Sequence, residues 1–162
     1  MEVLPMEVSN IIAMISLVFA LLGAAAVYGT DVFFCVVGRT ALTRVSDAAL
    51  VETMGRFHEV ADRRMPIFGV LGIVGALASV AFLRVSWPWA LSAVAAQVLW
   101  IVVYRRVAAP VNAELTRQAL AGSVPTDARA LQAQWDSVIV ARVLIMGFAM
   151  IALAVALVRS AQ

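Results

Sequence analysis

Four long apolar stretches constrain the fold of this chain more than any other feature. They cover about residues 11–37, 65–83, 87–104 and 138–158. A helix that crosses a bilayer needs roughly 20 mainly apolar residues, within a range of about 17–25, and all four stretches meet this length. Of the 162 residues, 64% are hydrophobic and only 14% are charged, which leaves too few polar groups to cover a water-facing surface. The sequence therefore predicts an integral membrane protein of the all-α class.

The connections between the stretches predict one four-helix bundle over residues 1–162, without a second domain or an internal repeat. A turn of three residues, 84–86, joins the second stretch to the third. The other two connections are long and polar, and their patterns are helical. We therefore expect helices that extend beyond the bilayer on one side.

The first long connection carries a helix start and an apolar face. Asp47, after Ser46, is predicted to cap the helix, because short polar side chains accept hydrogen bonds from free backbone N–H groups at a helix start. The residues of the predicted apolar face recur at helical spacing, and they are Leu50, Val51, Met54, Phe57 and Val60.

The second long connection continues the third helix past Pro110. Gly122 and Pro125 then mark a break, and the chain is expected to return to helix at Thr126.

The distribution of arginine predicts the orientation in the membrane. The two long connections carry nine arginines, and the opposite side carries only Arg84 and Arg159. Because basic loops stay in the cytoplasm, the long connections are expected there, with both termini outside.

The N-terminus lacks the basic flank and cleavage site of a signal peptide, so the first stretch is expected to be retained. The use of arginine without lysine, with abundant alanine, is typical of a bacterial genome rich in GC and suggests the plasma (inner) membrane.

The cysteine and histidine content excludes several classes of small membrane enzyme. Cys35 is the single cysteine, so the chain forms no internal disulfide and carries no paired-cysteine quinone reductase site. His58 is the single histidine, which excludes a bis-histidine haem within one chain. The arginines are scattered and not gathered with aromatic residues, so nucleic acid is not an expected partner.

Polar residues that are unusual in such a chain converge on the predicted cytoplasmic end. The candidate substrate-binding residues are Tyr28, Thr30, Asn112 and Trp135, and the candidate catalytic residues are Asp31, His58 and Arg142. Asp31 stands inside an apolar stretch, where a carboxylate is costly and points to a functional site. Two interpretations stay open for Asp31 and Arg142, a buried ion pair that fastens two helices and a role in a site. For Trp135 the alternative is an anchor at the membrane interface.

The HEVAD segment places His58 and Asp62 four residues apart on one helical face. With a carboxylate such as Asp31 or Glu114, they are a candidate site for a hard metal or iron. The alternative is an ordinary solvated helix face. The sequence leaves the cofactor open between none, a single iron or copper ion, and haem.

Several of these segments, taken in order, resemble one known family. They are GTDVFF in the first stretch, a polar stretch ending in MP, PVNAEL after the third, and a Trp and an Arg at the start of the fourth. The pattern, from about Val18 to Val158, is similar to the small four-helix membrane proteins that include the fungal anthrone oxygenases. The matching residues are Asp31, Pro110, Asn112, Trp135 and Arg142. The chain departs from the family at Val140 and Ala141, where members often have Asn or His.

The resemblance implies a membrane oxidoreductase that converts the central methylene of an anthrone-like aromatic substrate to a carbonyl. Asp31 or His58 is then a candidate base, and Arg142 a group that stabilises the resulting anion. Two other hypotheses stay open: a binding or proton-coupled transport protein that uses Asp31, and a structural membrane subunit. The expected partners are the lipid bilayer and a hydrophobic small molecule, and whether the chain forms a homo-oligomer is left open.

Overall fold

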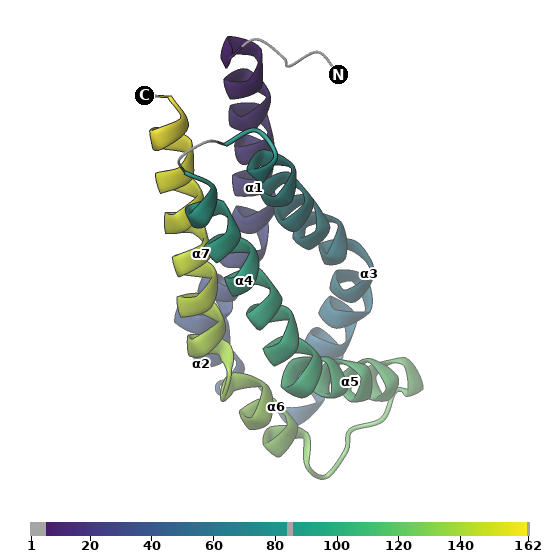
Figure 1. Ribbon diagram of the computed structural model, residues 1–162. Coiled ribbons are helices and arrows are strands. Elements are labelled where there is room, and N and C mark those ends of the chain that lie inside the picture. The colour runs from purple at the N-terminus through teal and green to yellow at the C-terminus, as the bar shows by residue number, and fades with distance from the viewer. Residues whose placement is uncertain (1–5, 84–85, 162) are drawn as a thin grey trace. The chain divides into compact units, whose positions relative to one another are not determined.

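The computed structural model describes residues 6–83 and 86–161, and these residues form helices and turns without a strand (Figure 1). The helical elements in chain order are α1 (Met6–Phe33), η1 (Phe34–Gly38), α2 (Arg39–Leu42), α3 (Asp47–Val80), α4 (Trp87–Val103), η2 (Tyr104–Ala108), α5 (Ala109–Ala121), α6 (Ala128–Asp136) and α7 (Ile139–Ser160). The prediction of an all-α protein is confirmed.

Within the described residues, four helical runs are long and apolar enough to cross a membrane. They are Glu7–Leu42, Asp47–Val80, Trp87–Ala121 and Ala128–Ser160. Three of them contain a predicted stretch and extend beyond it, and the run Asp47–Val80 covers the second stretch, 65–83, except for its last three residues. Of the predicted turn at 84–86, residues 84 and 85 lie outside the described part of the chain. The orientation of the helices in the membrane stays a prediction.

The start of α3 corrects the predicted cap. The hydroxyl of Ser46, one residue before the helix, accepts a hydrogen bond from the backbone N–H of Ala49 at 3.2 Å. Ser46 therefore caps the helix, and Asp47 is its first residue. An oxygen three residues before the N–H it accepts from is the usual geometry of a helix N-cap.

The apolar face predicted for α3 is only partly correct. Leu50, Val51 and Met54 are buried as expected, whereas Phe57 and Val60 are exposed. The buried row continues instead through His58, four residues after Met54. Residues four apart lie on one face of a helix, so the packed face follows Leu50, Met54 and His58. A polar residue thus takes a buried position that the apolar pattern alone assigned to its neighbours.

The predicted break after the third helix is confirmed. α5 ends at Ala121, and Gly122 adopts a left-handed conformation with φ of 63° that glycine tolerates best. The next helix, α6, begins at Ala128, two residues later than the sequence predicted.

The chain divides into two compact units. The first unit contains residues Met1–Tyr28, Ile67–Leu99 and Ile145–Gln162, and the second unit contains Gly29–Pro66 and Trp100–Leu144. Residues of α1, α3, α4 and α7 belong to both units. The single domain expected from the sequence stays a prediction.

Small residues fill the core of the first unit. Its fully buried positions are mostly alanine, including Ala20, Ala24 and Ala76. Gly23 on α1 lies so close to α3 that an added Cβ would stand 2.5 Å from the backbone nitrogen of Gly72. Small residues allow membrane helices to pack backbone against backbone, which is a main source of their association in lipid. Gly75 on α3 is close to α1 in the same way, because an added Cβ would stand 2.7 Å from the backbone oxygen of Ser16.

Apolar side chains from several helices form the core of the second unit. The cluster contains Leu42, Leu50, Val51, Met54, Ala108, Val111, Leu115, Ala119, Ala128, Trp135 and Ile139. Arg129 on α6 fastens the turn before α3, because its guanidinium donates to the carbonyls of Leu42 and Val45 and pairs with Asp47 at 2.7 Å. The helices that carry the polar residues are thus held by packing and by hydrogen bonds.

The close packing at Gly23 makes a testable prediction. In Gly23→Ala the new methyl group meets backbone atoms that cannot move aside, so we expect a loss of about 1–3 kcal/mol in the free energy of unfolding. The measurement is denaturant unfolding in detergent followed by circular dichroism. Gly69→Ala on α3 is the matched control, because an added Cβ meets nothing within 4 Å there. Equal stability of the two variants would contradict the prediction.

Candidate functional site

A buried ion pair lies at the centre of the polar residues in the second unit. Arg142 Nη2 donates to Asp31 Oδ1 at 2.5 Å, and Arg142 Nε donates to Asp31 Oδ2 at 3.3 Å. Asp31 is 1% exposed and Arg142 is 6% exposed. The ion pair that the sequence left as one interpretation is therefore present. It is a forked contact of guanidinium with carboxylate, the geometry that gives such pairs their strength.

Three aromatic rings surround the guanidinium of Arg142. Its Cζ atom lies 4.8 Å from the ring centre of Trp100, 5.3 Å from that of Trp135 and 5.8 Å from that of Tyr104. A cation within about 6 Å of an aromatic face is attracted by the electron density of the ring. Trp100 and Tyr104 are stacked on each other, with 5.4 Å between their centres and 2° between their planes. We call Trp100, Tyr104 and Trp135 the aromatic cage.

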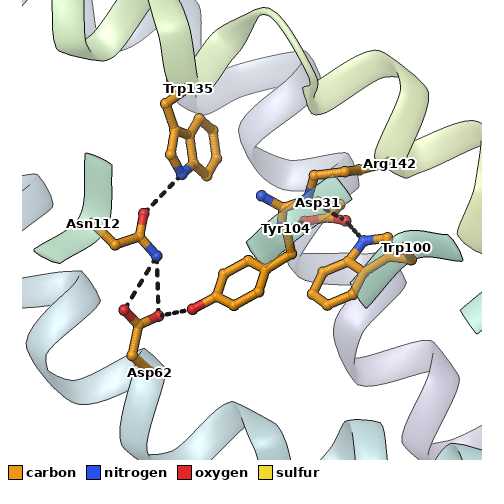
Figure 2. A network of polar contacts seen from close by, with 7 residues as sticks. All are labelled: Asp31, Asp62, Trp100, Tyr104, Asn112, Trp135 and Arg142. Carbon is orange, nitrogen blue, oxygen red and sulfur yellow. Dashed lines mark hydrogen bonds and ion pairs between the residues drawn. The ribbon is translucent and has the colours of Figure 1, made fainter. Parts of the chain in front are cut away.

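Each ring of the aromatic cage is held by a hydrogen bond from its polar edge. Trp100 Nε1 donates to Asp31 Oδ2 at 2.6 Å, and the hydroxyl of Tyr104 donates to Asp62 Oδ1 at 2.8 Å. Trp135 Nε1 donates to Asn112 Oδ1 at 3.0 Å. These bonds fix the ring planes around Arg142 (Figure 2).

Asn112 joins two parts of this network. Its side-chain nitrogen donates to Asp62 Oδ1 at 3.0 Å, while its oxygen accepts from Trp135. Figure 2 shows Asp62 at the far side of the network from Asp31, with Tyr104 reaching between them. The two carboxylates thus differ in environment, because Asp31 is buried and Asp62 is exposed.

Irregular helix turns accompany two of the elements that carry the site. The π-helical turn η1 follows Asp31 within three residues, and η2 begins at Tyr104. In η2 the N–H of Ala109 bonds to the carbonyl of Tyr104, five residues earlier. Pro110 follows directly, and its ring and missing N–H disfavour an ordinary α-helical turn at this point. Such π turns are frequent at functional sites because they re-aim the side chains around them.

Two buried polar atoms of this cluster have no hydrogen-bond partner among the described residues. They are Nη1 of Arg142 and Nε2 of His58. His58 is 5% exposed, and its ring centre lies 5.9 Å from that of Trp135. Buried polar groups in proteins are nearly always hydrogen-bonded, so an unpaired one calls for an explanation such as a role in binding. Both atoms belong to side chains that contact Trp135.

Most of the predicted site residues are brought together, and some are not. Asp31, Arg142, His58, Asn112 and Trp135 belong to one cluster of contacts in the second unit, as the preceding distances show.

Tyr28 belongs to the first unit, where its ring lies beside Gly147. Thr30 precedes Asp31 and is exposed.

The three predicted metal ligands do not form a site. Glu114 pairs with Arg117 at 2.6 Å and accepts a hydrogen bond from Gln118, whereas Asp62 bonds to Tyr104 and Asn112. Among the described residues, no group of three His, Cys, Asp or Glu side chains is arranged to hold a metal ion. His58 and Asp62 are four residues apart on the helix, but His58 is buried and Asp62 is exposed.

Sequence reasoning missed Trp100 and Tyr104. Both lie in the third apolar stretch, 87–104, whose aromatic residues the sequence analysis did not single out. Their spacing of four residues was the available signal, because it places two rings with polar edges on one helix face. Only the fold shows that this face meets Arg142.

The arrangement has defined chemical capacities. The guanidinium of Arg142 is held rigidly, and the NH₂ group of its Nη1 has no acceptor among the described residues, which suits it to stabilise a negative oxygen. The imidazole of His58 offers a nitrogen that can exchange a proton. Asp31 has hydrogen bonds at both oxygens, so it fixes Arg142 in place.

Comparison of the chain with protein-family models, with curated proteins and with solved structures finds no match.

The hydrogen bond from Trp100 to Asp31 makes a second testable prediction. Trp100→Phe keeps a ring over Arg142 but removes the N–H, so Asp31 loses a bond that is worth about 1.5–3 kcal/mol to a charged acceptor. We expect the free energy of unfolding to fall by that amount in a denaturant titration followed by circular dichroism. Trp87→Phe, at an exposed position of α4, is the control. An unchanged stability of Trp100→Phe would contradict the assigned bond.

Proposed function

We propose that this protein is a membrane-embedded oxidoreductase that acts on a flat, hydrophobic aromatic molecule, with its site in the second unit. The observation that carries the proposal is a pair of buried atoms, Arg142 Nη1 and His58 Nε2, that have no hydrogen-bond partner in the described part of the chain. Both side chains lie beside the ring of Trp135. A cation with a free N–H and a neighbouring imidazole are the groups required to remove a proton and to stabilise the anion that forms.

An aromatic substrate is favoured by a row of rings that leads toward this cluster. Phe33 and Phe57 are each 53% exposed. The ring of Phe34 lies 5.5 Å from Phe33, 6.5 Å from Phe57 and 5.3 Å from Trp135, all with edge-to-face geometry. Such rings offer contacts that suit a planar aromatic molecule arriving from lipid.

The proposed reaction is the oxygenation of an anthrone-like substrate, as the family resemblance implies. The methylene of an anthrone is acidic because its anion is delocalised onto the carbonyl oxygen. Removal of one proton gives an enolate, which reacts with dioxygen. The methylene is oxidised to a carbonyl, one oxygen atom of dioxygen enters the product, and the other leaves as water. The role assigned to Arg142 in this step is to donate a hydrogen bond to the enolate oxygen.

A structural role is the second candidate, and one observation favours it. Both oxygens of Asp31 are satisfied within the protein, as expected of an ion pair that only fastens α1 to α7. Under this alternative, variants of the cluster lose stability and no reaction is lost.

Proton-coupled transport is less favoured by the same contacts. A carboxylate that exchanges a proton for a lipophilic cation must become free of its counter-charge during the cycle. Asp31 is held by the guanidinium of Arg142, and the aromatic cage that suits a cation is occupied by that guanidinium. Efflux of a lipophilic cation from vesicles, abolished by Asp31→Asn, would favour transport.

The proposal predicts that detergent-purified protein accelerates the conversion of 1,8-dihydroxyanthrone to its anthraquinone with consumption of one dioxygen per molecule. Arg142→Lys keeps the charge opposite Asp31 but loses the planar fork. Loss of an oxyanion donor lowers turnover by about 100-fold or more, and we expect a fall of this size. Arg117→Lys, on the exposed face of α5, is expected to retain the wild-type rate.

Conversion by the wild type at the rate found in protein-free micelles would refute the proposal. The metal content and visible spectrum of the same sample show whether iron, copper or haem takes part.

A further inference from the structure

The arginines of the second unit fall into two groups by their partners. The first group forms ion pairs with carboxylates at 2.5–3.8 Å, and its members are Arg56, Arg63, Arg117, Arg129 and Arg142. The second group is exposed and has no ion pair among the described residues, and its members are Arg39, Arg44, Arg64, Arg105 and Arg106. The charges of the second group are therefore available to a partner outside the chain.

Three arginines of the second group stand at the ends of apolar stretches. Arg64 directly precedes the second stretch, 65–83, and Arg105 and Arg106 directly follow the third, 87–104. The residues just beyond the apolar part of a membrane helix lie at the level of the lipid headgroups. We call Arg64, Arg105 and Arg106 the boundary arginines.

A hydrogen bond joins the two segments that carry the boundary arginines. The hydroxyl of Tyr104, which directly precedes Arg105, donates to Asp62 Oδ1 at 2.8 Å, two residues before Arg64 (Figure 2). A helix rises about 1.5 Å per residue, so each boundary arginine lies within about 3 Å, along its helix axis, of the residue that makes this contact. The contact thus holds α3 and η2 together close to the level of the three charges.

Asp62 offsets these charges only in part. Its Oδ1 accepts from Tyr104 and from Asn112 at 2.8 and 3.0 Å, and its Oδ2 accepts from Asn112 at 3.3 Å. It forms no ion pair with an arginine among the described residues. One carboxylate that is bound by neutral donors faces three guanidinium groups, so this part of the surface keeps a positive charge.

Exposed apolar side chains adjoin the boundary arginines on the same run of helix. Ile101 and Val102 are 38% and 46% exposed, and they lie about one helical turn before Arg105 and Arg106. Residues about one turn apart share a face of a helix. An acyl chain that lies along this face has apolar contacts, and its headgroup comes to the level of the guanidinium groups.

We propose that the boundary arginines bind the phosphate groups of anionic phospholipids of the bilayer. A guanidinium donates two parallel N–H bonds to a phosphate. Each basic residue near an anionic membrane surface strengthens binding by a factor of about five. A zwitterionic lipid carries the same phosphate beside a cation that the arginines repel, so the anionic lipid is preferred. This inference goes beyond the proposed function and does not depend on it.

The test compares two lipids with the same acyl chains. The full chain, purified in a non-ionic detergent and freed of lipid, is titrated with phosphatidylglycerol or with phosphatidylcholine, and bound lipid is counted by native mass spectrometry. We expect the wild type to bind phosphatidylglycerol about 100-fold more tightly, the product of three such factors. Equal affinities for the two lipids would overturn the inference.

A pair of double variants separates position from net charge. Arg105→Gln/Arg106→Gln is expected to bind phosphatidylglycerol about 25-fold more weakly than the wild type, with unchanged affinity for phosphatidylcholine. Arg56→Gln/Arg117→Gln is the matched control, because it removes the same charge from positions farther from the apolar stretches. We expect this control to keep the wild-type affinity. An equal loss in both double variants would show that net charge alone acts and would overturn the assignment.

Arg64→Gln tests the other helix independently. Because Arg64 is exposed and without an ion pair among the described residues, the variant is expected to keep the circular dichroism spectrum of the wild type. The expected loss of affinity for phosphatidylglycerol is about fivefold. Wild-type affinity in Arg64→Gln would remove α3 from the lipid contact and overturn the inference as stated.

Inorganic phosphate distinguishes a lipid from a soluble anion. It has no acyl chain to contact Ile101 and Val102, so an excess of inorganic phosphate is expected to release no more phosphatidylglycerol than sodium chloride of the same ionic strength, which screens the charges equally. Release by inorganic phosphate beyond that of sodium chloride would assign the boundary arginines to a soluble phosphate and overturn the lipid.

Discussion

The ion pair between Asp31 and Arg142 is the interaction on which the polar part of the second unit depends. It joins α1 to α7 across 111 residues of sequence, and both charges are buried. Removing two charges from water is costly, and their attraction compensates only when the geometry is good and other hydrogen bonds complete it. Trp100 supplies one such bond, and the three rings of the aromatic cage add favourable contacts to the cation. The surrounding residues therefore offset the free-energy cost of burying the two charges.

Much of the fold follows from the sequence because its signals are local. Length and composition predict the four long helices, and Gly122 marks the break before α6 because a left-handed residue is needed there. The site is predicted only in part. A charge within an apolar stretch identified Asp31 and Arg142, since such charges need partners. Trp100 and Tyr104 were missed because they look like ordinary aromatic residues of a membrane helix until the fold brings their face to Arg142.

The features that stabilise this cluster also suit it to chemistry. A guanidinium held by a carboxylate and by rings with fixed planes is preorganised, and such a group stabilises a developing charge without rearranging. The hydrogen bonds of Asn112 extend this rigidity from Trp135 to Asp62. Buried networks are most costly when they are only partly satisfied. Among the described residues, the atoms of this cluster left without a partner are on Arg142 and His58, and the proposed function assigns binding to these two positions.

A double-mutant cycle between Asp31 and Arg142 tests the central claim most directly. The free energy of unfolding in detergent is measured for the wild type, Asp31→Asn, Arg142→Gln and the double variant. Each single change leaves a buried polar partner behind and is expected to cost about 3–5 kcal/mol. The double variant is expected to cost much less than the sum, because the second change removes the uncompensated group. Costs that add within about 0.5 kcal/mol would contradict the claim that this ion pair holds the unit together.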